Sequence, residues 1–170
     1  MNASTSADRS PGGLTITQQV RWGDMDAMGH VNNVVYFQYC ESGRIAYVDR
    51  LDTSSFREHE RQSLGMVAAN LNFRRQMHYP GEVIVETHVT EIGYKSFTVA
   101  YRLLDASDRQ VVAEGTSVCV WVDYAAGRAL PLPEALVDGI AQFEQQPALR
   151  DRWVAAVAER TAKTAERKST

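Results

Sequence analysis

Polar side chains that can do chemistry gather between residues 24 and 33, in the segment DMDAMGHVNN. The carboxylate of Asp26 could act as a general base toward water or as a nucleophile. Asparagine is a residue type that begins helices, and a helix that begins near Asn33 would present unpaired backbone N–H groups at the positive end of its dipole. Such donors can bind an oxyanion without help from a side chain. The segment therefore predicts a site for a reaction in which negative charge develops on a carbonyl oxygen.

The same residue types leave other roles open. Gly29 would let the backbone turn sharply and approach a ligand closely. Asp24 and Asp26 could both be caps of a turn or a helix, which is the usual role of aspartate in a polar turn. His30 could be a base or a carbonyl polariser, or a hydrogen-bonded part of the scaffold. The side chain of Asn32 could support the turn or contact a substrate.

These residues lie between two elements that would position them. Residues 14–22 alternate apolar and polar positions, as a half-buried strand does. Residues 34–51 are apolar all round in their first half, which is typical of a helix packed deep against a sheet. Gly43 destabilises such a helix by about 1 kcal/mol relative to alanine, so we expect the helix to approach the sheet closely there.

The rest of the chain predicts an α+β fold. Four further β-branched, alternating runs are joined by links too short for crossover helices, so we expect an antiparallel meander. With the first strand they would make a curved five-stranded sheet wrapped around the long helix, followed by a helical tail. Such a sheet is partly uncovered, which predicts a homodimer at least. The four runs are residues 64–79, 82–93, 96–105 and 110–123, and the tail is residues 131–163.

The segment from Arg21 to Asn33, followed by the aromatic-rich residues 34–39, resembles the signature of 4-hydroxybenzoyl-CoA-type hotdog thioesterases. That signature is a strand, then D-x-D-x-x-G-[HI]-V-N-N, then an aromatic-rich buried helix, and the resemblance covers roughly residues 14–125. It implies a hotdog fold, an acyl-CoA substrate and Asp26 as the catalytic residue. Asp24 matches the first aspartate of the motif and is interpreted as structural.

Two further places are candidates for contacts with CoA. Lys95 and Ser96 match the basic-Ser pair that opens the fourth strand in similar thioesterases; in a site between subunits they would serve the partner's Asp26. Arg74 and Arg75 are adjacent on a predicted strand, so they should point to opposite faces and only one can line a given groove. The predicted site has Asp26, Asn33 and His30 as catalytic residues, and Gly29, Asn32, Lys95, Ser96 and Arg74 as substrate and CoA contacts.

Glu41 falls on roughly the same face of the predicted helix as Asn33. It could be a second carboxylate of the site, because other hotdog branches use a glutamate on this helix. Arg44, three residues later, offers the alternative of an ion pair within the helix, which we favour.

Composition excludes several classes of protein. The 170 residues suffice for one domain with a core, and the formal net charge of -3 does not favour nucleic-acid binding. Cys40 and Cys119 lie in apolar runs and are expected to be buried thiols in a reducing compartment. The four histidines lack metal-ligand spacing, so neither a metal nor any other cofactor is expected beyond the CoA of the substrate. Without a signal-peptide pattern or a long apolar run, we expect a cytoplasmic protein that does not bind membranes.

The sequence predicts three segments and one activity. We expect a disordered tail over residues 1–13, a hotdog thioesterase domain over 14–128 and a helical extension over 129–170. The expected activity is hydrolysis of an acyl-CoA to a carboxylic acid and free CoA by a homotetramer built from dimers. A hotdog hydratase or dehydratase, a non-catalytic acyl-thioester-binding module and an acyl-ACP thioesterase are the alternatives.

Overall fold

The helices and strands follow the predicted order along the chain. The computed structural model describes residues 7–8, 12–51 and 61–168. The strands are β1 (Ala7–Asp8), β2 (Leu14–Val20), β3 (Gln62–Phe73), β4 (Gly81–Ile92), β5 (Ser96–Asp105), β6 (Val111–Asp123) and β7 (Arg128–Leu130). The helices are α1 (Asn33–Arg50), α2 (Glu134–Glu144) and α3 (Pro147–Lys168), with a 3-10 turn over Trp22–Asp24.

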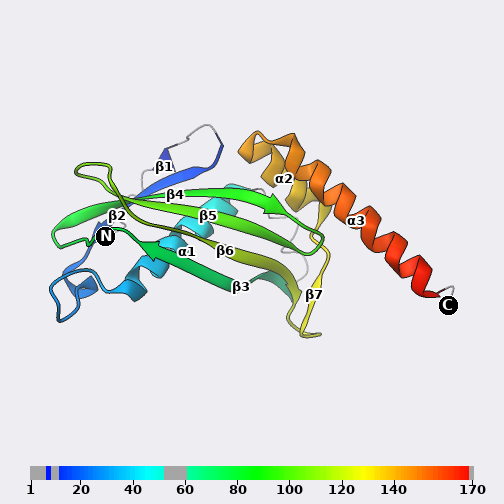
Figure 1. Ribbon diagram of the computed structural model, residues 1–170, viewed down its shortest axis with the longest axis horizontal. Helices are drawn as coiled ribbons and strands as arrows, with labels where there is room; N and C mark the ends of the chain where they lie inside the picture. The colour runs from blue at the N-terminus through cyan, green and yellow to red at the C-terminus, as the bar shows by residue number, and fades with distance from the viewer. Residues whose placement is uncertain (1–6, 9–11, 52–60, 169–170) are drawn as a thin grey trace.

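All strands form one antiparallel sheet in the order β1-β2-β4-β5-β6-β3, with β7 also paired to β6 (Figure 1). The five predicted strands are β2 to β6, and β1 and β7 are short additions. The predicted meander is right for β4, β5 and β6 but wrong for β3, which pairs with β6 instead of β4. The chain leaves β3 at Phe73 and reaches β4 only at Gly81, a link long enough to cross to another part of the sheet. As a result β3 is an edge strand.

Helix α1 lies across one face of the sheet, against β2 and β4 (Figure 1). A Cβ atom on Gly43 would come within 2.6 Å of the Thr87 hydroxyl and 2.9 Å of a Val85 methyl group, which confirms the expected close approach. The buried face of α1 consists of Val35, Tyr36, Tyr39, Cys40, Gly43 and Tyr47. This arrangement of helix and sheet is the α+β hotdog fold that the sequence predicts.

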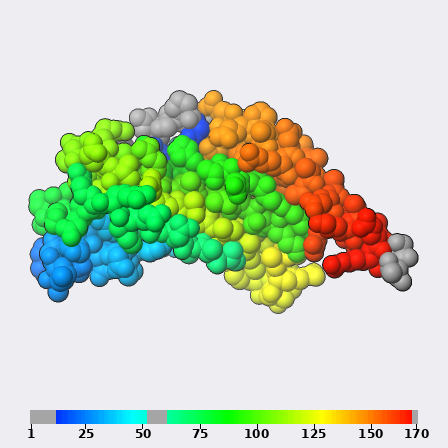
Figure 2. Space-filling view, viewed as in Figure 1, coloured from blue at the N-terminus to red at the C-terminus, as the bar shows by residue number. Residues whose placement is uncertain are grey.

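The C-terminal helices are tied to the core by a buried carboxylate. Glu144, the last residue of α2, accepts hydrogen bonds from the Tyr47 hydroxyl at 2.7 Å and the Val89 backbone N–H at 2.6 Å. Helix α3 then extends past the sheet to the C-terminal tip of the molecule (Figure 2). Within the described residues, no helix is long and apolar enough to span a membrane.

The predicted segment boundaries fall as follows. The boundary between residues 128 and 129 lies inside β7. Most of the predicted N-terminal tail lies outside the described residues, but its residues 7 and 8 form β1 and pair with Ile16 and Thr15 of β2.

Candidate active site

Asp24 anchors the loop that connects β2 to α1. Its carboxylate is buried and accepts hydrogen bonds from the Tyr39 hydroxyl at 2.9 Å and the Arg21 backbone N–H at 2.8 Å. Its carbonyl oxygen accepts the Asn32 N–H at 2.9 Å. Asp24 thus connects the loop to the middle and the beginning of α1, which fits the structural role expected for it.

The next residues form a tight turn around Asp26. One carboxylate oxygen of Asp26 accepts the Met28 N–H at 2.8 Å, and its carbonyl oxygen accepts the Gly29 N–H at 3.1 Å. Gly29 has a φ of 81°, in the left-handed region that glycine adopts without strain. Its carbonyl oxygen lies 2.9 Å from Nδ1 of His78, which holds the turn from the other side.

His30 lies beside the Asp26 carboxylate. Its Nδ1 is 3.5 Å from Oδ2 of Asp26 and 3.4 Å from the Val31 carbonyl oxygen. The side chains of His30 and Asp26 are 27% and 24% exposed, so both remain accessible to a small ligand. His30 can therefore orient the carboxylate or exchange a proton with it.

The beginning of α1 offers one unpaired donor. The side-chain oxygen of Asn32 accepts the Val34 N–H at 3.0 Å, and the Asn32 carbonyl oxygen accepts the Val35 N–H at 2.9 Å. Among the described residues, no acceptor lies within hydrogen-bond reach of the Asn33 N–H. Asn32 therefore acts as the helix cap, and the Asn33 N–H remains available at the positive end of the helix dipole.

A groove of about 340 Å³ brings these groups together. Its first wall is the turn and the beginning of α1; its second wall is the end of β3 and the residues that follow. The lining residues are Asp26, His30, Val31, Asn33, Tyr36, Phe73, Arg74, Arg75 and Gln76.

The prediction that only one of the two arginines can line a groove is wrong. Strand β3 ends at Phe73 instead of Tyr79, and the N–H groups of Arg74 and Arg75 both donate to the Val112 carbonyl oxygen, at 2.8 and 3.2 Å. Because the strand alternation ends there, both residues reach the same groove.

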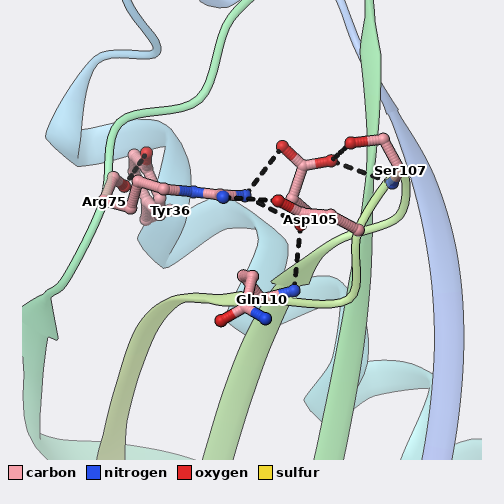
Figure 3. A network of polar contacts seen from close by, with 6 residues as sticks. Tyr36, Arg75, Asp105, Ser107 and Gln110 are labelled. Carbon is pink, nitrogen blue, oxygen red and sulfur yellow. Dashed lines mark hydrogen bonds and ion pairs between the residues drawn. The ribbon is translucent and has the colours of Figure 1, made fainter.

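Both arginines are paired with carboxylates of the sheet. Arg74 donates two hydrogen bonds to one oxygen of Glu114, at 2.7 and 3.0 Å. Arg75 contacts Asp105 at 3.1 Å and Asp108 at 2.5 Å, which fixes the second wall to the turn between β5 and β6 (Figure 3). The hydrogen bonds from Arg75 lower the pKa of the Asp108 carboxyl to about 2.

Tyr36 and Phe73 form the apolar floor of the groove. Their rings meet edge to face with centroids 5.3 Å apart, and the Tyr36 hydroxyl lies 3.5 Å from the Arg75 carbonyl oxygen. Burial raises the pKa of the Tyr36 hydroxyl, so it stays protonated. The sequence does not indicate that Phe73 and Gln76 line the groove, because their position depends on where β3 ends.

Lys95 and Ser96 lie at the end of strand β5 that is far from the groove of Asp26. Strand β5 begins at Ser96 and ends at Asp105, and Asp105 contacts Arg75 of the groove. Because nine residues of strand span about 30 Å, Ser96 is about that far from the groove. The Lys95 ammonium donates to the Ala129 carbonyl oxygen at 2.6 Å, and a hollow beside it is lined by Arg160 and Lys163 of α3. Within one chain these two residues are therefore separate from the other predicted site residues.

Glu41 does not join the groove of Asp26. Its carboxylate lies 3.6 Å from the Arg44 guanidinium, so the ion pair within the helix is confirmed.

Comparisons with known proteins identify the family of the chain. Residues 20–140 match the family model of the thioesterase-like superfamily. The long-chain acyl-CoA thioesterase FadM of Escherichia coli is 23% identical over 125 residues, which are 74% of this chain and 95% of FadM.

Two solved structures have the same fold. The PA2801 protein of Pseudomonas aeruginosa is 33% identical, covers 75% of this chain and 97% of its own, and superimposes with a TM-score of 0.68. A thioesterase of Thermus thermophilus, solved with coenzyme A and Zn, is 28% identical with a TM-score of 0.68, covering 78% of this chain and 95% of its own. The protein is thus a thioester hydrolase. By its sequence match and its hotdog fold, the chain belongs to the thioesterase-like superfamily.

Proposed function

We propose that this protein is an acyl-CoA thioesterase and that Asp26 and the Asn33 N–H carry its chemistry. The supporting observation is that one groove is lined by a partly exposed carboxylate and by the residue that has the unpaired N–H of α1. Thioester hydrolysis needs both an activated attacking group and a donor for the oxyanion. The relatives FadM and the Thermus protein, one named for acyl-CoA and one solved with CoA, support CoA as the carrier.

Two routes fit the position of Asp26. As a general base, Asp26 takes a proton from water, the hydroxide attacks the carbonyl carbon, and the oxyanion accepts the Asn33 N–H. The C–S bond then breaks and CoA leaves as the thiolate, which takes up the proton. As a nucleophile, Asp26 instead forms a mixed anhydride with release of the thiolate, and water hydrolyses the anhydride.

The second part of the proposal is a homodimer formed through β3. This edge strand exposes Met66, Val67 and Phe73, which are 52%, 63% and 48% exposed, and an exposed apolar edge is a template for pairing with another strand. An antiparallel pair of β3 strands, related by a two-fold axis near their middle, places the end of one strand beside the beginning of the other.

This pairing would complete the binding site for CoA. In the sheet register, Ser96 lies beside Val120 and Val120 beside Gly65, near the beginning of β3. The partner's Lys95 and Ser96 would therefore lie at the same end of the dimer as Asp26, two strands from the interface, or about 10 Å. We propose these residues as contacts for the CoA phosphates, together with Arg74. Gel filtration with light scattering should give at least a dimer, and a tetramer if dimers associate further.

The proposed reaction uses only water, substrate and protein groups, so we expect dialysis against EDTA to leave the activity unchanged. Cys40 and Cys119 are free and buried, which fits the proposed cytoplasmic location, where thiols stay reduced.

The central experiment measures thiol release with a chromogenic disulfide from acyl-CoAs that range from acetyl through palmitoyl to benzoyl and phenylacetyl. Wild type is compared with Asp26→Asn, and with Asp151→Asn as the same chemical change on exposed α3. We expect at least one substrate to be cleaved, with a loss of about a hundredfold or more in Asp26→Asn alone. A wild-type rate in Asp26→Asn would refute its catalytic role.

The measurement of thiol release also tests the hydratase alternative. The contact between His30 and Asp26 favours this alternative, because hydratase chemistry uses a histidine paired with an acid. A hydratase would change the absorbance of an enoyl-CoA without releasing thiol. Absence of thiol release from every substrate would refute the thioesterase proposal.

A further inference from the structure

The seam between α1 and β3 continues beyond the groove of Asp26. Next to the groove is a middle hollow of about 170 Å³, lined mainly by apolar side chains such as Val34, Phe37 and Leu71. An outer hollow of about 250 Å³ follows, between the second half of α1 and Leu64 and Trp121 of the sheet. The three hollows follow α1 from its beginning toward its end. The groove and the middle hollow are lined by the successive residues Asn33 and Val34, and the middle and outer hollows share Glu41 and Arg44.

Arg44 lines both the middle and the outer hollow. Its side chain is only 16% exposed, although a guanidinium withdrawn from water needs compensating partners. Its contacts with the described residues are all long: the Met66 sulfur and the Tyr101 hydroxyl at 3.5 Å, and the Glu41 carboxylate at 3.6 Å.

None of these contacts neutralises the guanidinium well. The Glu41 side chain is 58% exposed and therefore solvated, and the Tyr101 hydroxyl already shares a 2.7 Å hydrogen bond with Ser117. A guanidinium has five N–H donors in a planar fork that matches the two oxygens of a carboxylate. Among the described residues, Arg44 thus has N–H donors without a close acceptor, and it lies on the side of the middle hollow away from Asn33.

From these observations we infer that Arg44 is a specificity residue that binds a terminal carboxylate on the acyl group, so that the preferred substrates are CoA monothioesters of dicarboxylic acids. This inference rests on the proposed acyl-CoA hydrolysis and adds the class of acyl group. The ligand is anchored at one end by the Asn33 N–H and at the other by the guanidinium, with apolar methylene groups between.

The geometry of α1 sets the length of that acyl group. Asn33 and Arg44 are eleven residues apart, a rise of about 16 Å. The contact with Glu41 places the guanidinium about one turn closer to Asn33, at about 12 Å. After about 3 Å for a hydrogen bond at each end, about 6 Å remain for the chain. With C–C bonds of about 1.5 Å in a zigzag, this span suits an extended diacid of about six carbons, or one of about eight carbons in a bent conformation.

The test compares suberyl-CoA with octanoyl-CoA, which has the same number of carbons but ends in a methyl group. The variants are Arg44→Met, which keeps the apolar volume, and Arg50→Met, a matched change on the exposed end of α1. Wild type and Arg50→Met should cleave suberyl-CoA with a kcat/KM about tenfold or more above that of octanoyl-CoA. Arg44→Met should lose this preference while its kcat/KM for octanoyl-CoA stays within about threefold of wild type.

Two results would overturn the inference while acyl-CoA hydrolysis still stands. One is a wild type that cleaves octanoyl-CoA as well as or better than suberyl-CoA. The other is an Arg44→Met variant in which both rates fall together, which would mean that Arg44 holds the fold or meets a carboxylate of the partner subunit. If no acyl-CoA is cleaved at all, the proposed function itself fails, and this inference fails with it.

Discussion

Replacing Glu144 with alanine should destabilise the protein because it removes the only acceptor that the described residues provide for two buried donors. The Tyr47 hydroxyl and the Val89 N–H both donate to Oε1 of Glu144, and Tyr47 and Val89 are 1% and 0% exposed. A buried donor without an acceptor costs about 1–3 kcal/mol. Part of the loss is offset because a buried carboxylate no longer has to be desolvated. We therefore expect the free energy of unfolding to fall by about 3 kcal/mol.

Glu144→Gln provides the matched control. The amide oxygen can take the place of Oε1 and accept both hydrogen bonds, and the amide nitrogen then faces Nδ1 of His88, which lies 3.7 Å from Oε2 in the wild type. The loss should stay below about 1 kcal/mol. For a chain of this size, Tm changes by about 2–4 °C per kcal/mol, so Glu144→Ala should lower Tm by about 6–12 °C and Glu144→Gln by less than about 4 °C.

Thermal unfolding followed by circular dichroism measures both variants, and a double-mutant cycle with Tyr47→Phe isolates the contact. We expect a coupling energy of about 1–2 kcal/mol between positions 47 and 144. Equal Tm values for wild type and Glu144→Ala would show that the carboxylate does not support the core. Equal losses in the alanine and glutamine variants would show that charge, and not hydrogen bonding, is what matters.

Two further predictions concern stability. Asp24→Ala should lower the free energy of unfolding by about 2 kcal/mol and Asp24→Asn by less than about 1 kcal/mol, because only the asparagine can still accept the Tyr39 and Arg21 donors; equal Tm values for the two variants would contradict this. The Glu144 carboxylate, whose Oε2 lies 3.7 Å from Nδ1 of His88, raises the pKa of His88 above its usual value. The stabilising contribution of His88 is therefore complete below about pH 6.5, the pKa expected in the unfolded chain, and is lost as the pH rises through the raised folded-state pKa. The difference in Tm between wild type and His88→Asn should accordingly be larger at about pH 5.5 than at about pH 8.5, and a difference that does not change with pH would refute this.

Local patterns predicted the elements and the turn of the site well. Asn32 and Asn33 indicated where α1 begins, because a cap acts over one turn and its signal is contained in adjacent residues. Gly43 indicated the close approach of α1 to the sheet for a similar reason, since only a missing Cβ permits it. Residues from Asp26 to Asn33 lie together in the structure because they are neighbours in the chain.

Non-local features could not be predicted in this way. The pairing of β3 with β6 depends on which strand edge is free once β4, β5 and β6 have formed, and no local pattern encodes that choice. The end of β3 at Phe73 depends in turn on this pairing, which is why both arginines could reach one groove. Glu144 gave no signal either, because a glutamate in a polar helical tail resembles a solvated residue until its contact with Tyr47 is known.

The position of β3 also determines the order in which the chain can fold during synthesis. Residues 62–73 leave the ribosome well before residues 113–123, the segment of β6 with which they pair. At about 5–20 residues per second, the fifty residues from 74 to 123 take roughly 3–10 seconds to be made. Throughout that interval β3, with Met66 and Val67, lacks the β6 strand with which it pairs in the described structure. Translation speed between β3 and β6, and chaperones that hold unpaired strands, should therefore govern how much of this protein reaches its native state.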